Sequence, residues 1–251
     1  MDHYADINAE TIDRWVREGW EWGKPIDHAT YVRATKGDWE VQLSPTKKVP
    51  KEWFGDLRGK EVLGLCSGGG QQMPIFAAQG AKVAVIDYSK EQIASDVAVA
   101  QREGYEVEAI RADVTQGLPF EDGRFDLVFN PVSICYIRDV VSLWREAYRV
   151  TKPGGTLLTA FDTILNYIVD ADEERIVWRL PFDPVTQEEA RAFMEAEDAG
   201  MQFSHDLTDT IGAIIKSGYV LEDLFEDVNG EGRLHELNIP TYVVLKARKP
   251  L

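Results

Sequence analysis

The chain has 251 residues, enough for one large domain, and 44% of them are hydrophobic, enough to build a substantial core. Aspartate and glutamate total 43 against 27 lysine and arginine residues, which gives a net charge of −16 at pH 7. This acidity argues against nucleic-acid and anionic-membrane partners, because both attract clustered cations and no such cluster is visible.

The segment 1–55 predicts a helical cap that is rich in aromatic residues. Residues 13–18 have a helical pattern, and turn residues at Gly23, Pro45 and Pro50 break up the remainder of the segment. Five tryptophans lie here: Trp15, Trp20, Trp22, Trp39 and Trp53. The start lacks the basic and apolar stretches of a secretory signal, and no apolar run is long enough to cross a membrane, so we expect a cytoplasmic protein.

From residue 59 onward, short apolar strands alternate with helices, as in a doubly wound parallel α/β sheet. The expected strands are 61–66, 82–87, 107–113, 125–130, 156–161, 219–227 and 241–248. The expected helices are 73–79, 90–104 with Ser89 as N-cap, 140–150, 186–197 and 209–217. A turn at 152–155 introduces the fifth strand, and 162–207 breaks the alternation, which predicts an insertion over the mouth of the site.

Ligands of such sheets bind at the carboxyl ends of the strands. The first strand ends in a glycine-rich loop that runs from Cys66 to Gln72 and contains Gly68, Gly69 and Gly70. Glycines let the backbone approach a ligand closely, and the following helix points its amide groups at it. A simple tight turn is the alternative interpretation of this loop.

Two acidic residues end the next strands. Asp87 lies 19 residues beyond Gly68, where a carboxylate can accept hydrogen bonds from both ribose hydroxyls. Asp113 could accept a hydrogen bond from the amino group of adenine. Alternatively, Asp87 is an acid favoured by the dipole at a helix N-terminus. Together with the glycine loop, these residues predict an adenosine site.

Two adenosine cofactors fit such a site, a nicotinamide dinucleotide and S-adenosylmethionine (SAM). The dinucleotide motif G-x-G-x-x-G, counted from Gly68, would place its third glycine at position 73, which is Met73. A pyrophosphate also prefers positive surroundings, which are missing. The sequence favours SAM, with a nicotinamide-dependent oxidoreductase as the weaker alternative.

The run from Val62 to Gly70 resembles the first SAM-binding motif of class I SAM-dependent methyltransferases. The later motifs of that family have their counterparts in Asp87, Ala112–Asp113, Phe125–Val128, Arg149–Gly155 and the closing strand pair 219–227 and 241–248. The resemblance covers roughly residues 58–162 and 208–249 and is strongest to the small-molecule (methyltransferase type 11) branch, which includes quinone-biosynthesis enzymes. It implies a Rossmann-like, seven-stranded and mostly parallel sheet with an antiparallel last strand, and a small-molecule methyl acceptor.

The same resemblance implies which residues bind SAM. They are Cys66, Ser67, Gly68, Gly69, Gly70, Asp87, Tyr88, Ser89, Ala112, Asp113, Val114, Asn130, Pro131 and Val132. Two positions depart from the family pattern: Gly64 stands where the family has an acid that orients the loop and the methionine ammonium, and Cys66 replaces the first loop glycine. These departures keep open a SAM- or nucleotide-binding sensor without catalysis.

Methyl transfer is an in-line displacement that depends mainly on holding acceptor and methyl group in line and dry. Tyr136, after the fourth strand, could contact the acceptor, and His205 or His235, each beside a carboxylate, could be the base. Ordinary packing or surface roles are the alternatives for all three. The two cysteines and the scattered histidines have no ligand spacing, so no metal site is expected. The acceptor and the oligomeric state, monomer or homodimer, cannot be read from the sequence.

Overall fold

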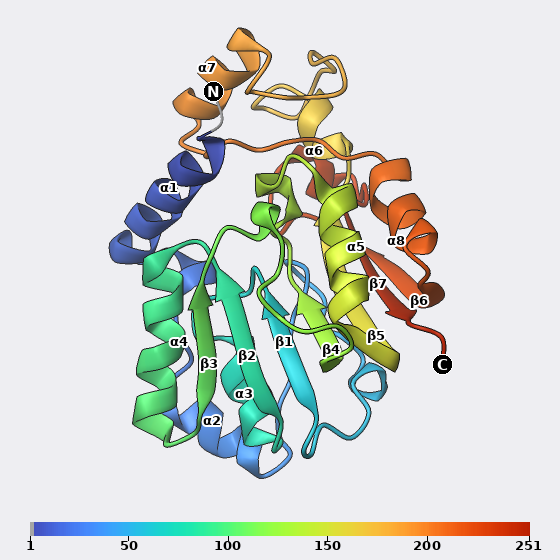
Figure 1. Cartoon of the computed structure of the whole chain (residues 1–251). Helices are drawn as coiled ribbons and strands as arrows, with labels where there is room; N and C mark the ends of the chain where they lie inside the picture. Colours follow the sequence, from blue (N-terminus) through green and yellow to red (C-terminus); the bar gives the residue numbers. More distant parts are fainter. Residues whose placement is uncertain (1–2) are drawn as a thin grey trace.

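The computed structural model describes residues 3–251, and a seven-stranded sheet forms its centre. Figure 1 shows the twist of this sheet. The strands lie in the order β3-β2-β1-β4-β5-β7-β6, and β7 is antiparallel to both of its neighbours. Their bounds are β1 Glu61–Leu65, β2 Lys82–Asp87, β3 Val107–Arg111, β4 Phe125–Asn130, β5 Thr151–Asp162, β6 Val220–Asp227 and β7 Tyr242–Arg248. The predicted fold, with its antiparallel last strand, is confirmed.

Helices cover both faces of the sheet because side chains of each strand alternate between two apolar cores. Leu63 and Ile86 face one core, beneath α5 and α8, while Val62 and Val85 face the other, beneath α2 and α3. The longer helices are α1 Tyr4–Glu18, α2 His28–Thr35, α3 Gln72–Ala78, α4 Lys90–Glu103, α5 Val140–Val150 and α7 Glu188–Ala196. The short α-helices are α6 Leu165–Ile168, α8 Ala213–Lys216 and α9 Arg233–Glu236.

Short 3-10 and π turns join these elements. The 3-10 turns are η1 Glu21–Gly23, η2 Lys51–Trp53, η3 Val114–Gln116 and η4 Ile134–Tyr136, and η5 Thr208–Gly212 is a π-helical turn that leads into α8. Ser89 caps α4 as expected, since its hydroxyl accepts a hydrogen bond from the Gln92 amide. Among the described residues, no helix is both long and apolar enough to cross a bilayer. The cytoplasmic location stays a prediction.

The structure differs from the sequence prediction around β5. The expected turn at 152–155 lies inside this strand, which begins at Thr151. The register with β4 shifts between Phe125 and Leu127, so the Lys-Pro-Gly-Gly residues form a bulge rather than a separate turn. Gly154 takes a φ of 77°, which explains the glycine at this position.

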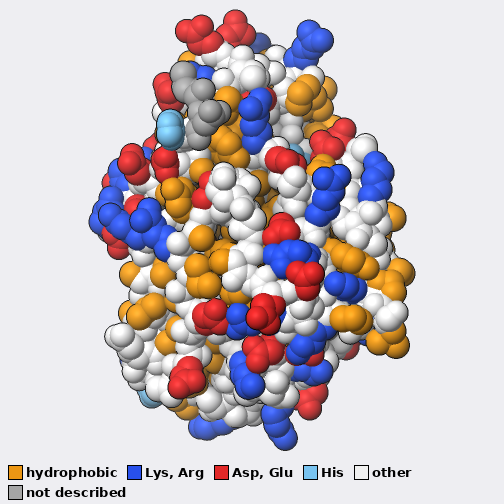
Figure 2. Space-filling view, viewed as in Figure 1, with side chains coloured by type: hydrophobic (Ala, Val, Ile, Leu, Met, Phe, Trp, Pro, Cys, Tyr) orange, Lys and Arg blue, Asp and Glu red, His pale blue; other side chains and the backbone are white. Residues whose placement is uncertain are grey.

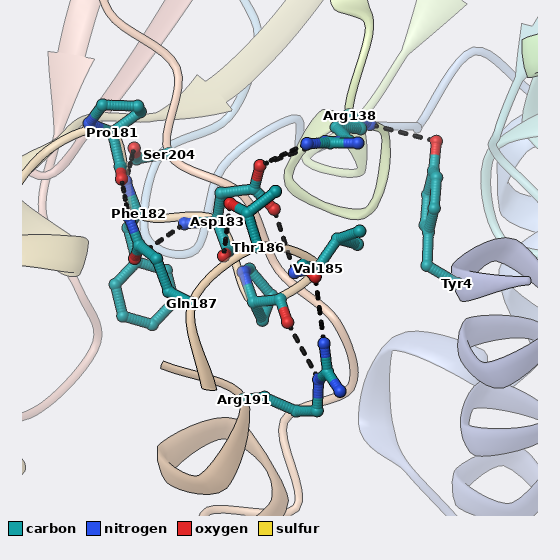
Figure 3. A network of polar contacts seen from close by, with 11 residues as sticks. Tyr4, Arg138, Pro181, Phe182, Asp183, Val185, Thr186, Gln187, Arg191 and Ser204 are labelled. Carbon is teal, nitrogen blue, oxygen red and sulfur yellow. Dashed lines mark hydrogen bonds and ion pairs between the residues drawn. The ribbon is translucent and has the colours of Figure 1, made fainter. Parts of the chain in front are cut away.

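The segment 162–207 and the N-terminal helix meet above the carboxyl edge of the sheet (Figure 1). Figure 3 shows how Asp183 holds this region together: its carboxylate accepts hydrogen bonds from the Arg138 guanidinium at 2.7 and 3.1 Å and from the Val185 amide at 2.9 Å. The Arg138 amide in turn donates to the Tyr4 hydroxyl of α1. The expected cap begins two residues before the described part of the chain. As a division into domains, the cap and the insertion stay predictions.

Candidate functional site

A cavity of about 950 Å³ opens at the carboxyl edge of the sheet, between the strand ends, α1 and the segment 162–207. Small-molecule sites commonly measure about 300–1,000 Å³, so this cavity has room for a cofactor together with an acceptor. The residues predicted from the sequence that line it are Cys66, Ser67, Gly68, Asp87, Tyr88, Ser89, Ala112, Asp113, Val114, Pro131, Val132 and Tyr136. The cavity therefore lies where the topology predicts a ligand.

Only part of the glycine-rich loop lines the cavity. Cys66 takes a φ of 48°, the left-handed region that favours glycine, which accounts for the glycine that the family usually has here. Gly69 and Gly70 do not line the cavity, because their backbone turns against α4: a Cβ on Gly69 would lie 2.7 Å from the Gln92 side-chain oxygen. Burial raises the pKa of the Cys66 thiol, so this group stays protonated.

A buried acid on α4 holds the loop from below. Asp96 is fully buried, and its Oδ2 accepts a hydrogen bond from the Gly70 amide at 3.0 Å. Burial raises its pKa to about 7. A Cβ at Gly64 would lie 2.9 Å from the Met73 sulfur, so the usual acid at this position would require the Met73 side chain to move. Asp96 is not among the residues predicted from the sequence, since its only signal there is a carboxylate on the buried face of a helix.

Asp87 ends β2 and faces the cavity. Its two oxygens accept hydrogen bonds from the Gly68 amide at 3.1 Å and the Ser89 amide at 3.0 Å. Burial raises the pKa of this carboxyl, and the amide donors oppose the shift by favouring the charged form. Each oxygen keeps a lone pair for a further donor, as two ribose hydroxyls would require.

Asp113 is half-buried after β3, and its Oδ1 caps η3 by accepting the Thr115 amide at 2.9 Å. Its neighbours Ala112 and Val114 also line the cavity, which gives this corner an apolar wall beside one acid. This composition suits a flat heteroaromatic ring with an amino group.

Asn130 lies behind the cavity wall rather than on its surface, whereas Pro131 and Val132 line it. The buried Asn130 amide donates to the Leu65 carbonyl at 2.8 Å, and its oxygen accepts the Thr159 hydroxyl at 2.8 Å. These bonds join the ends of β1, β4 and β5. Asn130 therefore positions the strand ends instead of contacting a ligand through its side chain.

The three residues predicted for catalysis do not lie together. Tyr136 lines the cavity, and burial raises the pKa of its phenol. His205 is buried outside the lining, with Nε2 at 3.2 Å from the Ile134 carbonyl, and burial lowers its pKa. His235 belongs to α9 and also lies outside the cavity lining in the described part of the chain. No geometry supports either histidine as a base at the cavity.

Acids and phenols that the sequence pattern did not predict lie at the other end of the cavity. Asp162, the last residue of β5, is 7% exposed and lines the cavity beside Tyr242, its register partner at the start of β7. The Tyr167 hydroxyl donates to Asp162 Oδ2. Burial raises the pKa of Asp162 to about 6, and the bond from Tyr167 opposes the shift. Cys135, also a lining residue, is a buried thiol.

Helix α1 closes the cavity on the side of β1–β3. Asp13 accepts the Ser89 hydroxyl at 2.6 Å, and Asn8 exchanges two hydrogen bonds with the backbone of Met201, so α1 is joined to α4 and to the segment 162–207. The tryptophans of the segment 1–55 divide between two roles. Trp15, Trp20 and Trp22 line the cavity, whereas Trp39 and Trp53 belong to the core against the sheet.

The charged side chains that line the cavity are all acidic. Its ionisable acids are Glu18, Asp87, Asp113, Asp162, Glu173 and Asp198, and within residues 3–251 no lysine, arginine or histidine lines it. The surface outside is mixed, and Figure 2 shows blue and red side chains interspersed over the drawn face. The missing cations are thus a property of the cavity and not of the whole chain.

Comparisons with known proteins agree with this geometry. Residues 63–159 match the family described as methyltransferase domain. The chain is similar to the uncharacterized methyltransferase YbaJ of Bacillus subtilis, with 32% identity over 92% of this chain and 93% of that protein. It is also similar to the demethylmenaquinone methyltransferase of Renibacterium salmoninarum, with 31% identity over 42% of this chain and 43% of that one.

Among solved structures, an S-adenosylmethionine-dependent methyltransferase from Mesorhizobium loti is similar in fold, with a TM-score of 0.63 and 20% identity over 79% of this chain and 95% of that one.

Proposed function

This chain belongs to the class I SAM-dependent methyltransferases, and we propose that it methylates a small molecule bound in the same cavity as SAM. The adenosine part of SAM would lie at the ends of β1–β3, against Asp87 and Asp113. The acceptor would lie at the ends of β4, β5 and β7. The observation that carries this proposal is the position of Asp87, whose two oxygens face the cavity with lone pairs free.

The charge of the cavity suits SAM better than a dinucleotide. SAM carries its methyl group on a positively charged sulfur, which makes that carbon electrophilic, and it also carries an ammonium group. A lining with six acids and, among the described residues, no cation favours such a ligand and disfavours a pyrophosphate. No feature of the cavity supports the nicotinamide alternative.

The chain's own residues would act by position and by excluding water. Helix α1 and the segment 162–207 cover the cavity, and Asn8 and Asp183 hold them in place. Asn130 fixes the ends of β1, β4 and β5 relative to one another. A fixed and dry arrangement of two reactants accounts for most of the rate gain expected in an in-line displacement.

Calorimetry with SAM and with NADH tests the cofactor assignment, and release of S-adenosylhomocysteine in the presence of candidate acceptors tests turnover. We expect SAM to bind, NADH not to bind, and an acceptor to increase the release. Binding of NADH without SAM would contradict the proposal. SAM binding without turnover on a broad acceptor panel would favour the sensor that the departures at Gly64 and Cys66 leave open.

A further inference from the structure

The acceptor end of the cavity contains one acid whose position differs from all the others. Of the six lining acids, Asp162 is the least exposed, and it lies three strands along the edge from Asp87, roughly 14 Å at about 4.8 Å per strand. It therefore belongs to the half of the cavity where the acceptor would bind rather than to the adenosine half.

Asp162 also keeps one oxygen free. Its Oδ2 accepts the Tyr167 hydroxyl, while Oδ1 receives no hydrogen bond from another residue in the described part of the chain; the backbone amide of Asp162 itself is the one further donor to this carboxylate. Glu173, the other acid nearby, is occupied: its oxygens accept the Leu234 amide at 2.6 Å and the Asn229 side-chain amide at 3.3 Å. A carboxylate oxygen that faces a cavity and has no partner on another residue can accept a hydrogen bond from a donor on the ligand.

The surroundings favour a cation over an acid or a phenol at this position. The groups that face Asp162 are one thiol and three phenols, and burial raises the pKa of each: Cys135, Tyr136, Tyr167 and Tyr242. The charge of Asp162 raises them further, so a phenolic acceptor bound here would resist ionisation in the same way. A carboxylate or phosphate group would meet the negative charge of Asp162 and, among the described lining residues, no cation. An ammonium group gains from both Asp162 and the aromatic rings.

We propose that the methyl acceptor is a small amine, cationic in solution, whose nitrogen binds Asp162 Oδ1. This inference rests on the proposed function. Asp162 accepts a proton from the ammonium group, which frees the nitrogen lone pair. The nitrogen then forms a bond to the methyl carbon while the carbon–sulfur bond of SAM breaks and its electron pair stays on sulfur. The product is an N-methylated ammonium, and Asp162 returns its proton to solvent when the product leaves.

The test compares matched ligands on the full chain saturated with S-adenosylhomocysteine. Benzylamine, butylamine and tryptamine are each titrated beside the corresponding alcohol and carboxylate. In a separate assay, with SAM in place of S-adenosylhomocysteine, methylation of each compound is measured. We expect an amine to bind at least about tenfold more tightly than its alcohol and acid, and to be the compound that is methylated. Preference for an alcohol or acid, or no preference at all, would overturn the inference.

The variant Asp162→Asn tests the residue itself. Asparagine has the same shape and can still accept the Tyr167 hydroxyl, so we expect S-adenosylhomocysteine affinity to change by less than about threefold while the amine preference disappears. Glu189→Gln, an exposed position on α7 outside the cavity, is the matched control and should keep the preference. An amine preference that survives in Asp162→Asn would assign recognition elsewhere. If wild-type protein does not bind S-adenosylhomocysteine, the proposed function fails instead.

Discussion

Replacing Asp87 with alanine is expected to weaken SAM binding strongly while leaving the fold intact. The carboxylate lies at the end of β2, accepts the Gly68 and Ser89 amides at 3.1 and 3.0 Å, and lines the cavity with one lone pair free on each oxygen. The substitution removes both expected bonds to the ribose. It also leaves two backbone amides of the cofactor loops without their acceptor.

The loss of SAM binding free energy in Asp87→Ala depends on the number of hydrogen bonds lost. A hydrogen bond to a charged group contributes about 1.5–3 kcal/mol, so two of them account for about 3–6 kcal/mol. Water that enters the vacated space replaces part of this loss. We therefore take the lower end, about 3 kcal/mol, which corresponds to an increase in Kd of about 100-fold or more.

Isothermal titration calorimetry with SAM measures this change directly, and thermal denaturation of the ligand-free protein checks the fold. Asp209→Ala is the matched control, because Asp209 is an exposed aspartate on η5 outside the cavity. It should bind SAM like the wild type. A Kd for Asp87→Ala within about threefold of the control would refute the ribose assignment.

Three further predictions concern other buried polar groups. With an amine acceptor, kcat/KM should fall as the pH drops through about 6, because protonated Asp162 cannot accept a proton, and Asp162→Asn should lack this limb in the pH profile. Asp96 has a folded-state pKa raised to about 7, so its contribution to stability is largest below about pH 4 and is lost as the pH rises through 7. Asp96→Asn keeps an acceptor for the Gly70 amide and should therefore unfold at a higher temperature than the wild type at pH 8. An unchanged or lower unfolding temperature would contradict this prediction. Asn130→Leu leaves buried partners such as the Thr159 hydroxyl unpaired, so it should lower the free energy of unfolding, measured by urea denaturation, by about 2–4 kcal/mol. A loss under about 1 kcal/mol would show that the Asn130 hydrogen bonds contribute little to stability.

Much of the fold could be predicted from the sequence because the strands are short apolar runs whose ends carry turn or acidic residues. β2 and β4 have the bounds that the pattern predicts, and β1 and α4 differ by one residue. The bulge in β5 could not be predicted, since Lys-Pro-Gly-Gly is equally compatible with a turn and only the pairing with β4 decides between them.

The residues of the site also fall into two groups, those that the sequence could predict and those that it could not. Asp87 and Asp113 could be located because strand ends in a parallel sheet share one edge. Asp162 and Asp96 could not, because their importance comes from burial and from partners distant in sequence, such as the hydrogen bond from Gly70 to Asp96. His205 and His235 could not be placed for a related reason: a neighbouring carboxylate in the sequence says nothing about which surface of the fold the imidazole reaches.

A crystal structure with bound S-adenosylhomocysteine tests the central claim most directly. We predict both ribose hydroxyls within hydrogen-bond distance of the Asp87 carboxylate, the adenine beside Asp113, and the sulfur facing the half of the cavity that contains Asp162. A ribose bound at Asp162, or a ligand bound outside this cavity, would contradict the assignment of the cofactor and acceptor halves.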